Sequence, residues 1–108
     1  YHTPHAAEIP FAFDTLEFAK SIGGEPTAAA QALADQMSAA WAQFARTGDP
    51  NTGKTVEWPK YNSTTRPTLI WNEAPMGPRV ENDPRSEQRQ RMLGYGSQQY
   101  GEREVGPT

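Results

Sequence analysis

The feature that most constrains this chain is a long, alanine-rich segment between Pro26 and Pro50. Its apolar side chains recur at steps of three and four residues, which is the spacing of one helix face: Ala30, Leu33, Met37, Ala40, Trp41 and Phe44. Because alanine has the highest helix propensity, we expect a helix from about Pro26 to Thr47. Pro26 suits the first helical position, where its missing N–H has no helical partner. Gly48 should end the helix in a left-handed conformation.

Shorter elements are predicted on both sides of this helix. Residues 1–13 should form a loop that ends in an apolar patch, and Asp14 should cap a short helix that ends at Lys20. Residues 48–66 should form an ordered loop. Thr68–Trp71 is rich in β-forming residues and should be a short strand. Trp71 and Trp58 are expected to pack beneath the C-terminal loop.

A terminal helix is expected from Pro84 to Leu93. Asp83 is in position to cap its start, and Gly94 is in position to stop it. Its charged side chains should form a solvated face rather than a nucleic-acid patch: Arg85, Glu87, Arg89 and Arg91. Residues 95–108 have no apolar periodicity, so we expect a flexible C-terminal tail.

The composition favours part of a larger domain. The 108 residues include 10 Pro and 9 Gly, only 35% are hydrophobic, and the mean hydropathy is −0.82. A small chain this polar will not easily enclose a core alone, yet 3 Trp, 4 Phe and 4 Tyr are too many for a disordered tail. The sequence also begins inside an apparent loop, without Met. We therefore expect a fragment, of which residues 1–94 pack against polypeptide outside this sequence.

Charge and residue usage argue against several classes of partner. The net charge is −3 and there is no basic run, which disfavours nucleic-acid binding. No stretch approaches the roughly 20 apolar residues of a membrane span. The absence of Cys excludes a disulfide or thiolate metal site within the sequence. The cellular compartment stays open.

The sequence contains two histidines, His2 and His5. Imidazole is the usual general base at neutral pH, because its pKa is near 6.5. Spacing alone distinguishes neither residue from an ordinary exposed loop histidine. No metal site is expected, because the two histidines have no convincing third ligand near them.

Four motifs in a fixed order change this interpretation. The first is H-A-A-E-I-P-F-A-F, from His5 to Phe13. It is followed by W-A-Q-F-A-R-T-G-D-P-N from Trp41, W-P-K-Y from Trp58, and N-D-P from Asn82. Together they resemble type-B carboxylesterases and cholinesterases, over about residues 4–94. Within that family, the bacterial para-nitrobenzyl esterase group is the most similar.

The resemblance implies the C-terminal portion of an α/β-hydrolase fold: a long helix, a short edge strand and a terminal helix, not a complete domain. Hydrolases of this fold carry their triad in the chain order Ser, Asp or Glu, His. His5 is then the catalytic histidine. The nucleophile and acid must lie upstream, since no serine here has a G-x-S-x-G frame: Ser21, Ser38, Ser63, Ser86 and Ser97.

The implied function is that of a serine carboxylesterase, which hydrolyses carboxylic esters through an acyl-enzyme. Its partners would be a small-molecule ester and the upstream segment of the same esterase, with no metal or organic cofactor. By the same resemblance, Glu8 is a supporting carboxylate behind the catalytic centre, or else an ordinary capping acid. Phe11 and Phe13 are candidates for the substrate pocket, with core packing as the alternative.

Two other functions compete with the esterase. Non-catalytic adhesion or binding proteins share the cholinesterase-like fold but have lost triad residues, and an upstream G-x-S-x-G would argue against them. An independent helical binding module is the second alternative. It would be a soluble monomer that melts cooperatively by itself.

Overall fold

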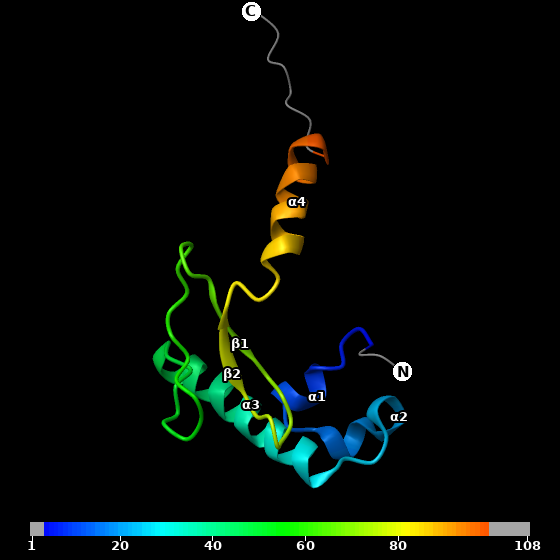
Figure 1. Cartoon of the computed structure of the whole chain (residues 1–108). Coiled ribbons are helices and arrows are strands. Elements are labelled where there is room, and N and C mark those ends of the chain that lie inside the picture. The colour runs from blue at the N-terminus through cyan, green and yellow to red at the C-terminus, as the bar shows by residue number, and fades with distance from the viewer. Residues whose placement is uncertain (1–3, 100–108) are drawn as a thin grey trace, which may run out of the picture.

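The computed structural model describes residues 4–99, apart from the side chains of residue 22 and residues 96–99. Its elements, shown in Figure 1, are five helical segments and one pair of strands: α1 (Ile9–Ala12), the 3₁₀ helix η1 (Leu16–Ala19), α2 (Lys20–Gly23), α3 (Ala28–Thr47), β1 (Pro67–Ile70), β2 (Arg79–Asn82) and α4 (Ser86–Gln99). No helix among these residues has the length and hydropathy of a membrane span.

The core lies along α3. Five buried apolar residues belong to this helix, and two more, Pro67 and Leu69, belong to β1; the five in α3 are Ala30, Leu33, Ala34, Met37 and Ala40. Burying a side chain the size of Leu33 or Met37 contributes about 1.5–3 kcal/mol relative to leaving it in water. The predicted apolar stripe is therefore confirmed at its centre. Its last two members, Trp41 and Phe44, are exposed, because the described chain covers that end of the helix only in part.

Both ends of α3 are capped. Thr27, not Pro26, precedes the first helical residue, and its Oγ1 accepts a hydrogen bond from the Ala30 N–H at 3.0 Å. The prediction for Pro26 was wrong, because a threonine hydroxyl can satisfy a free helical N–H whereas proline can only tolerate the position. Gly48 ends the helix as predicted, with φ of 80° and its N–H donating to the Phe44 carbonyl.

The N-terminal segment has more helix than expected. Part of the predicted loop forms α1, which packs on α3. Asp14 is not a helix cap: its φ is 52° and its carboxylate accepts a hydrogen bond from Gln31 at 2.7 Å. Thr15 precedes η1 instead, and the helical stretch continues through α2. Asp14 thus ties the segment to α3 by a contact that the local sequence could not indicate.

The two strands form an antiparallel pair. Pro67 is opposite Asn82, and Ile70 is opposite Arg79. The predicted strand is present but begins and ends one residue earlier than expected. The sequence predicted no strand at β2, because a four-residue strand containing Arg, Glu and Asn has no alternating apolar signal. Leu69 is buried, which anchors the pair.

Three tryptophans join the end of α3 to the loop and the strands. The ring centroids of Trp41 and Trp58 are 6.3 Å apart, those of Trp41 and Trp71 are 6.1 Å apart, and those of Trp58 and Trp71 are 6.0 Å apart. Trp58 and Trp71 meet edge to face, one of the arrangements that aromatic pairs prefer. The expectation that both are packing residues is confirmed, and Trp41 completes the cluster.

The terminal helix α4 differs from its prediction at both ends. It begins at Ser86 rather than Pro84, and it passes through Gly94 to Gln99, so residues 95–99 are helical. Residues 100–108 of the expected tail lie outside the described residues. Asp83 does not cap the helix by its side chain; the carboxylate forms a bidentate ion pair with Arg89, at 2.9–3.1 Å. Arg89 is therefore half-buried and is not part of a purely solvated face.

Candidate active site

His5 lies in a turn that leads into α1, and its side chain is exposed. The turn is held by backbone hydrogen bonds from Ala7 N–H to the Pro4 carbonyl and from Ile9 N–H to the Ala6 carbonyl, both 3.3 Å. Ala6 has a φ of 65°, in the left-handed region that costs a residue with a Cβ about 1–2 kcal/mol. Strained backbone of this kind is concentrated at functional sites. No sequence signal marks Ala6, because alanine is not among the residues that favour a positive φ.

Glu8 occupies the position before the first residue of α1. Its backbone carbonyl accepts hydrogen bonds from the N–H groups of Phe11 and Ala12, each at 3.0 Å. Its carboxylate makes no capping hydrogen bond and is exposed. The side chain is therefore available to a partner outside residues 4–99.

Phe11 and Phe13 differ in exposure. Phe11 is half-buried and lines a small groove of about 220 Å³, together with Pro10, Leu16 and Ala30. Phe13 is 73% exposed. Of the two candidates for a substrate pocket, Phe13 is the one whose ring is open to solvent.

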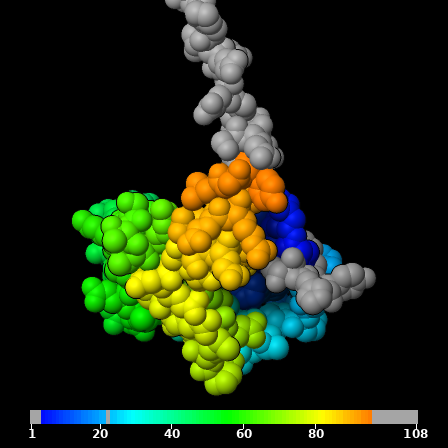
Figure 2. All heavy atoms as spheres, turned by 45° about the horizontal axis from the view of Figure 1, so that its top comes forward, coloured from blue at the N-terminus to red at the C-terminus, as the bar shows by residue number. Residues whose placement is uncertain are grey.

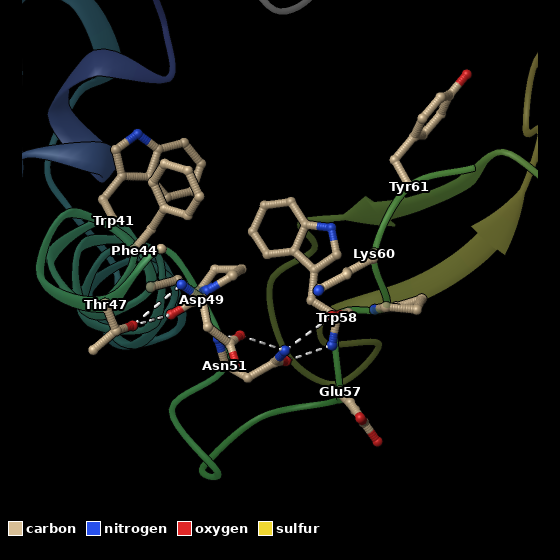
Figure 3. Close-up of a pocket in the computed structure, with 13 residues that line it drawn as sticks. Trp41, Phe44, Thr47, Asp49, Asn51, Glu57, Trp58, Lys60 and Tyr61 are labelled. Carbon is tan, nitrogen blue, oxygen red and sulfur yellow. Dashed lines mark hydrogen bonds between the residues drawn. The ribbon is translucent and has the colours of Figure 1, made fainter. Parts of the chain in front are cut away.

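A larger groove lies at the other end of α3, away from these residues. Its volume is about 860 Å³, and its lining includes four aromatic residues, Trp41, Phe44, Trp58 and Tyr61 (Figure 3). We call it the aromatic groove. His5 does not contribute to its lining. It therefore does not form part of a site around His5.

Asn51 shapes one wall of the aromatic groove. Its side-chain oxygen accepts the Trp58 N–H at 2.6 Å, and its Nδ2 donates to the Trp58 carbonyl at 2.9 Å (Figure 3). The Asp49 carboxylate accepts the Asn51 backbone N–H at 3.0 Å and its Nδ2 at 2.8 Å. These two donors hold the pKa of Asp49 below its usual range. They fix the loop without supplying a nucleophile or a base.

The described chain holds one histidine but no serine with the geometry of a nucleophile. A nucleophilic serine of a hydrolase sits on a sharp turn between a strand and a helix. The segment that comes nearest to a G-x-S-x-G frame, Gly94 to Ser97, has its glycines at the wrong positions and lies inside α4. The described residues can thus offer a base at His5, but they lack the group from which it would take a proton.

The fold around this site is that of an α/β-hydrolase. Two solved structures of PNB esterase match it with TM-scores of 0.71 and 0.67, each at 39% sequence identity. The matches cover 80% and 82% of this chain, and 17% of each PNB esterase chain. The chain is thus the equivalent of a small part of that fold, as the ordered motifs predicted.

The sequence comparisons identify the family. The carboxylesterase family model matches residues 1–92, so the chain belongs to that family. It is 39% identical over 90 residues to para-nitrobenzyl esterase from Bacillus subtilis (strain 168), covering 82% of this chain and 18% of that protein. It is 47% identical over 58 residues to carboxylesterase 4A from Bos taurus, covering 54% of this chain and 10% of that protein. The chain therefore spans less than a fifth of the length of these relatives.

Proposed function

We propose that this chain supplies the catalytic histidine, His5, to a serine carboxylesterase whose nucleophile and triad acid lie in the upstream part of the same protein. The observation that carries the proposal is the exposed His5, at a strained turn, at the start of a long match to the carboxylesterase family. To reach a serine on another segment of the protein, the His5 side chain must not be buried by the segment to which it belongs.

The proposed reaction is acyl transfer through an ester intermediate on the serine. One ring nitrogen of His5 takes the serine proton as the serine oxygen attacks the carbonyl carbon. The same proton then passes to the alkoxide oxygen of the departing alcohol, and the acyl-enzyme remains. In the second half, His5 takes a proton from water as the water oxygen attacks the acyl carbon, and it returns that proton to the serine oxygen as the bond to the acyl group breaks and the acid leaves. An upstream carboxylate would orient the imidazole and stabilise its charged form.

Carboxylic esters are the substrate class we propose, and no metal or organic cofactor is needed for these steps. Benzyl esters are the first to test, since one relative is a para-nitrobenzyl esterase. Phe13, which is exposed beside the His5 segment, could line the pocket for the acyl or alcohol group. Glu8 would support the catalytic centre through hydrogen bonds with upstream groups.

The direct test is the variant His5→Ala in the intact esterase. Since triad members act as a unit, kcat should fall by about 10⁴-fold or more. His2→Ala is the matched control, because it removes the same imidazole three residues away, and it should leave kcat near the wild-type value. Near-normal turnover by His5→Ala would remove His5 from the mechanism.

Glu8 is tested by Glu8→Gln, which preserves its size and removes its charge. A supporting role predicts a lower kcat with KM little changed, since the carboxylate would not touch the substrate. Unchanged kcat across the pH range would make Glu8 an ordinary surface acid.

A further inference from the structure

The N-terminal segment presents an apolar surface that the described chain leaves uncovered. We define the N-terminal face as the side chains of Ile9, Phe13 and Phe18, which are 48%, 73% and 89% exposed. Phe18 and Phe13 are the two most exposed of the large apolar residues in the described part of the chain. Exposing two phenylalanine rings to water is unfavourable, so this surface requires an explanation.

The other side of the same segment is already packed. Phe11 and Leu16 line the small groove that also includes Ala30 of α3, and α1 contacts α3 directly. α1 and η1 are each four residues long, and neither has a buried residue. Helices this short depend on tertiary packing for their stability. The segment therefore packs on α3 with one side and leaves its other side uncovered, as expected of the middle layer of a larger fold.

The catalytic candidate is close to this face along the chain. His5 is four residues before Ile9, and the turn between them is held by hydrogen bonds. The PNB esterase structures are about six times longer than the matched part, since that part is 17% of each chain. An esterase of similar length would have ample polypeptide to supply the missing layer.

We propose that the N-terminal face docks against an apolar surface of the upstream, nucleophile-bearing part of the same esterase. This inference rests on the proposed function and adds to it the surface by which His5 is brought to the serine. Glu8, Asp14 and Glu17 each adjoin a residue of this face in the sequence and are exposed, and Asp14 and Glu17 also interact with Gln31 and Lys20. The upstream surface should therefore be apolar at its centre, with cationic or N–H donor groups at its edge.

The aromatic groove is a separate surface. It is formed by the far part of α3 and the 48–61 segment, whereas the N-terminal segment lies on the opposite side of the molecule in both Figure 1 and Figure 2. Phe44 is fourteen positions after Ala30, which is about 21 Å along the helix. A partner that covers only the aromatic groove would leave His5 exposed.

The test is hydroxyl-radical footprinting of the intact, monomeric esterase, read out by mass spectrometry at Phe18 and Ile9. Labelling is compared with the same residues in the denatured protein. If Phe18 becomes as buried as Leu33, which is 8% exposed, its labelling should fall about tenfold relative to the unfolded chain. Labelling within twofold of the denatured value would overturn the proposal. Protection that appears only as the protein dimerises would overturn it as well, since the occupant would then be a second copy.

The variants Phe18→Lys and Phe18→Leu provide a second measurement. Lysine would place a charge in the proposed interface and should lower the Tm of the intact esterase by about 2–5 °C, since 1 kcal/mol shifts the Tm of a protein of that length by roughly 1 °C. Leucine keeps the surface apolar and should restore most of that loss. Equal Tm values for the two variants would overturn the docking assignment. Because Phe18 is almost fully exposed in the described fold, neither change should disturb the segment itself.

The docking surface and the catalytic proposal fail in different ways. If Phe18 is protected while His5→Ala retains turnover, the docking surface stands and the catalytic role of His5 is lost. If His5→Ala is inactive while Phe18 is labelled at its unfolded rate, the catalytic role stands and another surface of the segment makes the contact.

Discussion

Replacing Asn51 by Ala should loosen the 48–61 loop without unfolding the rest of the molecule. The Asn51 amide both accepts from the N–H of Trp58 and donates to its carbonyl, so one side chain takes the place of a strand partner for that residue. Trp58 in turn packs against Trp41 and Trp71. Alanine removes both hydrogen bonds and leaves the backbone of Trp58 free to move away from the other two rings.

The size of the effect follows from the number of bonds lost. A net contribution of about 1 kcal/mol for each hydrogen bond gives about 2 kcal/mol for the pair. That corresponds to a roughly 30-fold increase in the local opening equilibrium, since 1.4 kcal/mol is about a factor of ten. Hydrogen–deuterium exchange of the intact esterase, measured on peptides that contain Trp58, should report this increase. The near-ultraviolet circular dichroism of the tryptophans should weaken in the same variant.

Asn62→Ala is the matched control. The Asn62 oxygen accepts from the N–H groups of Thr64 and Thr65 at 3.0 and 2.8 Å, so it also makes two bonds to the backbone. They close an exposed local turn rather than linking two segments, so their loss should affect only that turn. If Asn51→Ala changes the exchange of Trp58 by less than about threefold, the side chain does not hold the loop.

Three further predictions concern the ends of the two long helices. Thr27→Ala removes the hydroxyl that caps α3 and should lower the free energy of unfolding by about 1 kcal/mol, measured by urea denaturation with Thr27→Ser as the control that retains the cap. Gly48→Ala should lower the free energy of unfolding by about 1–2 kcal/mol in the same assay. No atom lies within 4 Å of the added methyl group, so backbone strain at a φ of 80° is the only cause of this loss. An unchanged denaturation midpoint would show that the strain is absent. The Arg89 guanidinium holds the pKa of Asp83 below its usual range, so the stability from this pair is present above the unfolded pKa of about 3.9 and is lost as the pH falls through the folded pKa. In an acid titration followed by the helical circular dichroism signal, this loss should appear as a step at low pH, and Asp83→Asn should abolish the step. A step that persists in the variant would come from another group.

The elements that the sequence predicted correctly are those whose signal is local. The helix α3 follows from alanine content, an apolar stripe at helical spacing and a glycine at its end. The family follows from motifs whose order and spacing are properties of the chain itself. His5 also came from the sequence: it was singled out because of the motif around it, and its role remains a proposal.

The tertiary structure decided what depended on contacts between distant residues. Asp14 and Asp83 both resemble helix caps, but one bonds to Gln31 and the other to Arg89, because side-chain partners compete with free helical N–H groups. The strand β2 is stabilised by pairing with β1, which a four-residue polar segment does not reveal. The exposure of Phe13 and Phe18 could not be predicted either, since burial depends on what lies opposite a side chain. The sequence thus determined the family and the long helix, whereas the structure revealed the uncovered face beside His5.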